Sequence, residues 1–167
     1  EELDAEIVRA LQEALQPLGV DRGGLLHVMA GSPVVRGSHL WYAEGIEHVS
    51  AEINLAELFP WSYERMVVLG KVRAVERLTD LPPEAEVDRQ SYLQMGNKSA
   101  LGIPLFVGSE VHHLIVAQSQ VSECRWPEDL ISHLRLLGDV FVSALRRRDD
   151  DEALRIAKEN LDMAAAS

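Results

Sequence analysis

Two strand-like runs in the second half of the chain constrain the fold most strongly. Residues 99–107 and 110–118 are largely apolar, and only Gly108 and Ser109 separate them. Glycine in the first position of a two-residue loop suits the tight turn of a β-hairpin. Pro104 lies inside the first run, so its missing N–H must face a sheet edge or a bulge. The pattern therefore predicts an antiparallel hairpin of two long strands.

The rest of the chain alternates between helical and extended patterns. Apolar residues recur at helical spacing over residues 3–18, until Pro17 and Gly19 end the run. Short apolar or alternating segments between glycines, prolines and other turn residues indicate strands. The predicted elements are strands at residues 25–30, 38–44 and 71–77, two short helices between residues 54 and 69, and a further helix at residues 84–95.

A long helix is predicted from Pro127 onward. Its apolar residues keep a four-three spacing from residue 130 to residue 144, and a second apolar stripe starts at residue 154, shifted by one position. Between the stripes, each arginine of residues 146–148 has an acidic partner four residues later. The shift resembles a stutter between a segment packed on the domain and a linker coiled coil. The residues predicted to form a dimerising, signalling helix are Leu130, Leu134, Leu137, Phe141, Leu154 and Leu161.

Composition and charge narrow the class of protein. A chain of 167 residues suffices for one domain with a packed core. Its 27 acidic and 16 basic residues leave a net charge of -11, which disfavours nucleic acid and anionic membranes as partners. Cys124 is the only cysteine, so an internal disulfide is impossible and a reducing, cytoplasmic setting fits.

The two ends of the sequence predict that it is a piece of a longer protein. It begins without methionine and stops inside a helix-prone tract that has no glycine or proline stop signal. No apolar run approaches the length of a membrane-spanning helix, so this piece is expected to be soluble.

The sequence lacks the common motifs of catalysis and metal binding. It has no Gly-x-Ser-x-Gly elbow, no His-Glu-x-x-His motif and no glycine-rich phosphate loop. His112 and His113 are adjacent, and on a regular strand their side chains point to opposite faces, so they are not expected to chelate together. His27 and His39 come from different predicted strands and could meet, but no further ligand completes a site. No catalytic residue and no metal ligand is predicted, and Cys124 is expected to be a packed small residue.

Aromatic and thioether side chains gather in the segments that precede the hairpin. Such residues fill protein cores, and they also build concave apolar binding sites. Both interpretations stay open at this point, and core packing is the more common outcome. The candidate residues of a small-molecule site are Trp41, Trp61, Tyr63, Met66, Tyr92 and Met95.

Four short segments together resemble a bacterial GAF domain. They are Phe-Pro-Trp-Ser-Tyr-Glu-Arg at residues 59–65, Leu-Pro-Pro-Glu-Ala at 81–85, Lys-Ser-Ala-Leu-Gly-Ile-Pro-Leu-Phe-Val-Gly at 98–108 and Arg-Trp-Pro-Glu-Asp-Leu at 125–130. The resemblance implies an α+β fold in which a central antiparallel sheet has helices on both faces. The N- and C-terminal helices would pack together on one face, and a small-molecule pocket would lie on the other. It further implies a GAF sensory domain at residues 1–148 and the start of a signalling-helix linker at residues 149–167.

The same resemblance implies a role in bacterial signal transduction. The leading hypothesis is a non-catalytic input domain that senses a small molecule, dimerises and passes a signal to the histidine kinase of a two-component phosphorelay. The regulatory domain of a sigma-54-dependent transcription activator is the first alternative. A GAF-like methionine sulfoxide reductase is the second, although Cys124 alone cannot form the internal disulfide expected of such an enzyme.

The resemblance leaves the ligand and any cofactor unidentified. Members of the family that bind cyclic nucleotides carry Asn-Lys-x-Phe-Asp-Glu, whereas Asn97 and Lys98 continue here as Ser-Ala-Leu. The cysteine-histidine pair of many bilin-binding members is absent as well, and no haem motif is present. The expected partners are a second copy of the chain, an unknown small molecule and a downstream output domain. No contact with nucleic acid or with a membrane is expected of this domain.

Overall fold

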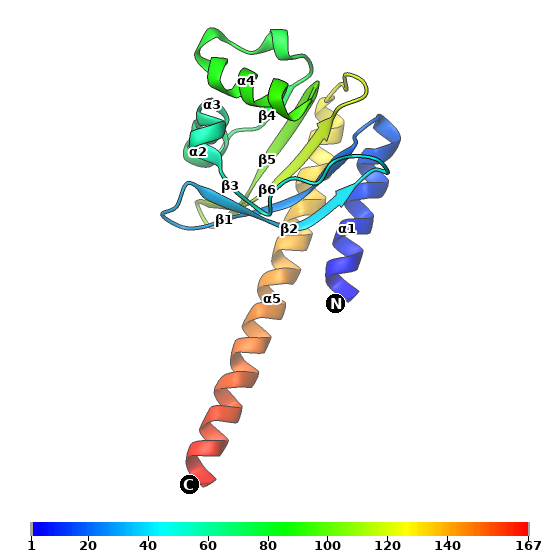
Figure 1. Ribbon diagram of the computed structural model, residues 1–167. Coiled ribbons are helices and arrows are strands. Elements are labelled where there is room, and N and C mark those ends of the chain that lie inside the picture. The colour runs from blue at the N-terminus through cyan, green and yellow to red at the C-terminus, as the bar shows by residue number, and fades with distance from the viewer. Residues whose placement is uncertain (1, 167) are drawn as a thin grey trace.

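The computed structural model describes residues 2–166 and shows a layered α+β arrangement from which one long helix projects (Figure 1). Within these residues, six strands form one antiparallel sheet in the order β3-β2-β1-β6-β5-β4. The strands are β1 (Arg22–Val28), β2 (Val34–Tyr42), β3 (Glu52–Asn54), β4 (Arg73–Val75), β5 (Ser99–Val107) and β6 (Glu110–Ser119). The helices are α1 (Glu2–Leu15), α2 (Leu55–Leu58), α3 (Pro60–Tyr63), α4 (Glu86–Met95) and α5 (Glu128–Ala166), with a π-helical segment at Glu64–Val68 and 3-10 turns at Gln16–Leu18, Leu78–Asp80 and Pro83–Ala85.

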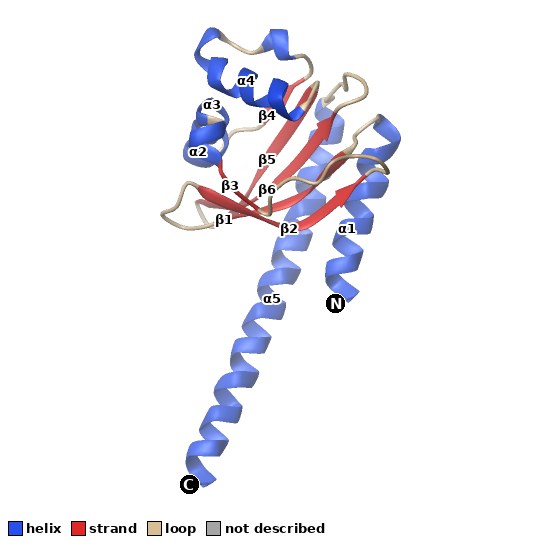
Figure 2. Ribbon diagram, in the orientation of Figure 1, coloured by secondary structure: helices blue, strands red, loops and turns tan. Residues whose placement is uncertain are grey.

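The helices divide between the two faces of the sheet (Figure 2). Helices α1 and α5 lie side by side on one face, which we call the helix face, and their apolar side chains pack there against Leu25, Ile103 and Ile115. Helices α2, α3 and α4 lie on the opposite face, which we call the cavity face, where Tyr92 and Leu114 belong to a second buried cluster. The α+β fold expected from the sequence is confirmed, with the terminal helices together on one face.

The predicted hairpin is present as β5 and β6, which lie near the centre of the sheet. Pro104 is tolerated because β4 pairs only with residues 100–102 of β5. On the β4 side, therefore, no strand lies beside Pro104 to receive an N–H. One residue further on, the register shifts: Leu105 pairs with His113, Phe106 pairs with Val111, and His112 is left as an extra residue. This β-bulge changes the direction of the side chains that follow it.

Strand β1 begins three residues earlier than the sequence pattern predicts, and it includes Gly23 and Gly24. Their missing side chains allow the neighbouring strands to approach closely, since a Cβ on Gly23 would lie 2.6 Å from the carbonyl oxygen of Val116. The prediction that these glycines lie outside the strand is therefore wrong. Strand β3 is not predicted either, because its three residues are too few to show an alternation.

Helix α5 has one face on the domain and continues well beyond it (Figure 1). Leu134 and Phe141 are buried against the sheet, and Leu130 and Leu137 pack beside them. In contrast, Leu154 and Leu161 are 60% and 70% exposed. The six residues predicted to form one dimerising surface thus lie on two: four hold α5 on its own domain, and two remain exposed. Every described residue from 149 to 166 is exposed.

Polar contacts fix α1 to the sheet and to α5. The carboxylate of Asp4 on α1 lies 2.7 Å from Nε2 of His39 on β2 and 2.8 Å from Nη1 of Arg148 on α5.

Among the described helices, even the long α5 is too polar to cross a lipid bilayer.

Candidate functional site

A cavity of about 60 Å³ lies between the cavity face of the sheet and the segments that cover it. Strands β1, β2 and β6 supply its floor, and Tyr92 and Met95 of α4 and Met66 of the π-helical segment contribute to its wall. Residues 49–51 of the loop that follows β2 complete the lining. The wall is mostly apolar, as in ordinary small-molecule sites.

The covering helices are held in place by buried polar groups. The side chain of Asp88 on α4 is fully buried and accepts hydrogen bonds from the backbone N–H groups of Trp61 and Ser62, at 3.0 and 2.9 Å. These N–H groups belong to the first turn of α3 and have no helical acceptor of their own. The hydroxyl groups of Ser62 and Tyr92 lie 3.2 Å apart, which joins α3 to α4 a second time. These hydrogen bonds fix α3 and α4 relative to each other, so the wall of the cavity is well ordered.

Four of the six predicted ligand-binding residues line the cavity, namely Trp41, Met66, Tyr92 and Met95. Trp61 and Tyr63 do not line it. The ring of Trp61 lies 5.6 Å from the guanidinium carbon of Arg65, in a separate surface hollow, and Tyr63 borders another hollow. On a helix, neighbouring positions face different directions, so the aromatic cluster of residues 59–63 divides between the cavity and the surface.

Two buried arginines that were not predicted as site residues also line the cavity, Arg22 on β1 and Arg73 on β4. Of the described residues that line it, none is Asp or Glu. Arg22 is held by three neutral oxygens: Oε1 of Gln118 at 2.6 Å, Oδ1 of Asn97 at 3.0 Å and the carbonyl oxygen of Glu47 at 3.2 Å. Burial lowers the pKa of Arg22, because a charged group is costly to remove from water.

Arg73 is even less well accommodated than Arg22. Only 3% of its surface is exposed, and within the described residues its Nε and Nη2 atoms have no hydrogen-bond acceptor. The guanidinium carbon lies 5.7 Å from the centre of the Tyr92 ring, and the group extends over Gly102, where a Cβ would come within 3.2 Å of Nη2. The indole N–H of Trp41 is also buried without an acceptor among the described residues. The cavity thus has hydrogen-bond donors to offer, two of them on a cation.

A sequence signal for Arg73 did exist. The alternation over residues 71–77 places Arg73 on the same face as Val75, and both are buried. A charged residue in register with a buried apolar one is the pattern of a functional or specially paired group. Arg22 had no such signal, because it stands before two glycines and outside the predicted strand.

The histidines do not follow the prediction made from the sequence. Nδ1 of His112 and Nδ1 of His113 lie 2.9 Å apart, so the expectation that these side chains point to opposite faces is wrong. The cause is the bulge in β6, which a sequence pattern does not reveal. His27 on β1 joins them, with its ring centre 5.0 Å from each of the others. His39 lies apart, at the hydrogen bond with Asp4.

Cys124 is a packed residue on the helix face. It is 3% exposed, it belongs to the core beneath α1 and α5, and its Sγ lies 3.3 Å from the carbonyl oxygen of Leu18. Burial raises the pKa of its thiol, so the reactive thiolate is disfavoured. Cys124 is not among the described residues that line the cavity.

The protein is similar to known proteins in structure but not detectably in sequence. The sequence matches no protein-family model and no curated protein. The structure, however, superposes on the phycoerythrobilin-bound GAF domain of a cyanobacterial phytochrome with a TM-score of 0.72, at 17% identity over 90% of this chain and 89% of that one. The chain has the GAF fold.

Other proteins with the GAF fold have different roles. A domain of a two-component sensor histidine kinase from Sinorhizobium meliloti has a TM-score of 0.65 and 17% identity over 93% of this chain and 97% of that one. A free methionine-R-sulfoxide reductase from Neisseria meningitidis, solved with its substrate, has a TM-score of 0.64 and 13% identity over 87% and 81%. These three neighbours thus belong to a sensor histidine kinase, to an enzyme and to a phytochrome.

Proposed function

We propose that this GAF domain is a non-catalytic sensory module that binds a small anionic molecule in the cavity and signals through α5. The observation that carries the proposal is the buried guanidinium of Arg73, whose Nε and Nη2 atoms have no acceptor among the described residues. A ligand with a carboxylate or a similar group would supply the missing acceptors. The rest of the ligand would be apolar, to match the wall.

Energetics favour a ligand over a purely structural role for Arg73. A buried charge without a partner destabilises a fold by several kcal/mol, and proteins seldom keep one without a use. The chain as a whole has a net charge of -11, yet the charged residues that line this cavity, among those described, are both arginines. Arg22 adds a second positive charge, which its neutral hydrogen-bond partners do not cancel and which the carboxylates of Glu47 and Asp21, outside the cavity lining, stabilise in part. The cavity is therefore an electropositive, largely apolar site in an acidic protein.

The first test replaces Arg73 with methionine, which keeps a long side chain and removes the charge. We expect the melting temperature of the ligand-free protein to rise, because an unpaired buried charge has been removed. We expect the affinity for a short monocarboxylate such as butyrate to fall roughly 10- to 150-fold, the equivalent of one charged hydrogen-bonding interaction of about 1.5–3 kcal/mol. Both quantities follow from thermal-shift titrations over a series of monocarboxylates.

The matched control is Arg77→Met, since Arg77 has an exposed side chain and lies outside the cavity. This variant should bind carboxylates as the unmodified protein does. A ligand-free Arg73→Met protein that is less stable than the unmodified chain, with unchanged carboxylate affinity, would contradict the proposal. Native mass spectrometry of freshly purified protein would identify any ligand that is retained.

Signal output would use a second face of α5. An exposed stripe with alternating four- and three-residue steps runs along the helix without interruption from the domain into its extension. The stripe consists of Leu136, Val140, Ser143, Arg147, Asp150, Leu154, Ala157, Leu161 and Ala164. Its two ends, Leu136–Val140 and Leu154–Ala164, have the apolar spacing of a two-stranded coiled coil, and Ser143, Arg147 and Asp150 form a polar middle between them. The one-position shift between the two apolar stripes therefore marks two faces of α5, one packed on the domain and one exposed. The proposed partner of the exposed face is a second copy of the chain.

The second test introduces charge into this stripe. The double variant Leu154→Glu, Leu161→Glu is expected to weaken dimerisation at least 100-fold, because each buried leucine contributes about 1.5–3 kcal/mol. Ile156→Glu is the control, since Ile156 is 45% exposed but lies off the stripe. Sedimentation equilibrium distinguishes the variants. A monomeric unmodified protein at high concentration would refute the dimer, as would equal weakening by the control.

The output is proposed to be the histidine kinase of a cytoplasmic two-component system. The support for it is the likeness to the Sinorhizobium meliloti domain, which covers nearly all of both chains. A sigma-54-dependent activator would use the same ligand and helix, and the two proposals differ only in the output domain that would receive the signal. A methionine sulfoxide reductase receives no support from the site, because Cys124 lies in the core of the helix face.

A further inference from the structure

The three-histidine cluster lies apart from the cavity. His27 on β1 is paired with His113 on β6, two residues along from the pair Leu25 and Ile115. Residues two apart on a strand point to the same face, and Leu25 and Ile115 point to the helix face, so the histidines do as well. The cavity is on the opposite face. The cluster is also separate from the carboxylate that holds α1, since Asp4 bonds to His39 and Arg148. Nothing in the proposed sensory role makes use of these three imidazoles.

The geometry brings one ring nitrogen of each histidine into a small space. These three nitrogen atoms all lie within 4.8 Å of one another. Nδ1 of His112 and Nδ1 of His113 are 2.9 Å apart. Tetrahedral zinc, with Zn–N bonds of about 2.0–2.1 Å, needs nitrogen atoms about 3.3–3.4 Å apart. This value lies between the 2.9 Å separation of the two Nδ1 atoms and the 4.8 Å limit, and rotation of the partly exposed His27 and His112 rings can adjust the distances. His113 is 94% buried, so its ring is held in place by the surrounding side chains.

We propose that His27, His112 and His113 form a binding site for one divalent first-row transition-metal ion, of which Zn²⁺ is the representative. Three imidazoles without a thiolate are the donor set that suits Zn²⁺, Cu²⁺, Ni²⁺ and Co²⁺. The fourth position of a tetrahedral ion is open to water, as it is in zinc sites with three protein ligands.

Burial favours the neutral, metal-binding form of His27 and His113. Burial, followed by the neighbouring His112 and His27, lowers the pKa of His113 to about 3. Burial, His112 and Arg36 lower the pKa of His27, and the carboxylate of Asp149 on α5 opposes them. The charge of Arg36 is in turn paired with Glu52 at 2.8 Å. A metal ion binds the neutral imidazole, and both shifts favour that form.

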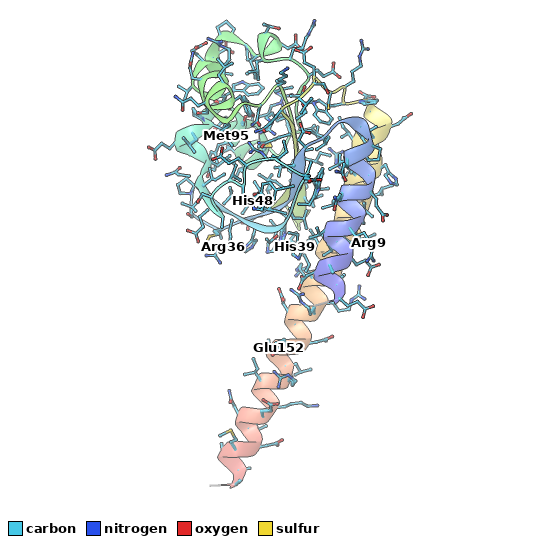
Figure 3. The ribbon with its side chains drawn as sticks, turned by 45° about the vertical axis from the view of Figure 1, so that its right-hand side comes forward. Arg9, Arg36, His39, His48, Met95 and Glu152 are labelled. Atoms are coloured by element: carbon cyan, nitrogen blue, oxygen red, sulfur yellow. The ribbon has the colours of Figure 1, made fainter. Side chains whose placement is uncertain are left out.

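The position of the site next to α5 gives it a structural consequence. Gly138 of α5 packs on Leu105 and Ile115, and Leu105 is the strand partner of His113. Three turns further along α5, Asp149 acts electrostatically on His27, at the point where the exposed extension begins. Figure 3 shows His39, on the neighbouring strand, at this end of the domain beside α1, and Glu152 just beyond on α5. An ion that fixes β1 to the bulge of β6 would therefore stiffen the sheet where the helix departs.

The test is a titration of the untagged protein with Zn²⁺ by isothermal calorimetry, followed by Co²⁺ to record the visible absorption of a tetrahedral ion. We expect one ion per chain and a rise in melting temperature with Zn²⁺. His27→Ala and His112→Ala should each weaken binding at least about 10-fold. Both residues are partly exposed, so neither variant is expected to unfold, which far-UV circular dichroism will check.

Two controls define the outcome. His133→Ala removes an exposed histidine of α5 and should leave the affinity unchanged. Arg73→Met should also bind Zn²⁺ with unchanged affinity, since the cavity and the histidine cluster are on opposite faces of the sheet. The metal site is therefore tested independently of the proposed sensory function. Stoichiometry below one ion per chain, or equal affinity in His27→Ala, His112→Ala and the unmodified protein, would overturn the metal site.

Discussion

A Gly24→Ala variant is expected to be largely unfolded at 25 °C. Gly24 has a φ of +143°, and a Cβ built on it would lie 1.8 Å from the carbonyl oxygen of His39. That oxygen belongs to the backbone of β2, so no side-chain rotation relieves the clash and β1 would have to separate from β2. The expected loss exceeds about 5 kcal/mol, which equals the whole stability of a domain at the lower end of the usual range of about 5–15 kcal/mol.

Gly31→Ala is the matched control, because Gly31 also has a positive φ, +71°, but has no atom within 4 Å of the position of a Cβ. This variant bears only the backbone strain of a left-handed residue, about 1–2 kcal/mol. Urea unfolding followed by far-UV circular dichroism compares the two. Similar midpoints for Gly24→Ala and Gly31→Ala would show that the close approach of β1 and β2 is not required.

A Leu134→Ala variant is expected to lose about 2–5 kcal/mol of unfolding free energy. Leu134 has no exposed surface and belongs to the core between α5 and the sheet. Truncation leaves a cavity that the surrounding helices and strands fill only in part, so both the transfer energy and the packing contacts are lost. The measured quantity is the shift in the urea midpoint at constant slope.

Leu136→Ala separates this effect from helix propensity. Leu136 lies two residues away on the same helix, but it is 69% exposed. Its substitution should change the free energy of unfolding by less than about 0.5 kcal/mol. Both variants are measured at low protein concentration, where any dimer has dissociated and cannot contribute to stability. Equal destabilisation by the two variants would refute the assignment of the inward and outward faces of α5.

Periodicity explains which elements could be predicted. The hairpin of β5 and β6 is confirmed almost to the residue, and α1 and α5 were found as well, because their apolar spacing is set by local geometry. Prediction failed where the backbone departs from regularity. Gly23 and Gly24 lie before the strand predicted at residues 25–30, although they are strand residues that admit close neighbours, and β3 is too short for any pattern.

The candidate site was predictable only in part. Trp41, Met66, Tyr92 and Met95 line the cavity because aromatic and thioether residues are concentrated in the segments that cover the sheet. Trp61 and Tyr63 have the same chemistry but face elsewhere, since the side-chain directions on α3 depend on how that helix docks on Asp88. The two arginines emerged only when distant strands were brought around one cavity.

What the sequence determined by itself is the element order, the long C-terminal helix and the two registers along it, because each follows from spacing between near neighbours, while the class of fold came from the resemblance of four short segments to a GAF domain. Tertiary structure alone decided which register faces the sheet, where buried charges lie without partners, and that three histidines meet. The physical reason is that burial and side-chain direction depend on strand pairing and on irregularities such as the β6 bulge. A one-residue bulge moves a side chain from one face of a sheet to the other, and no local pattern records it.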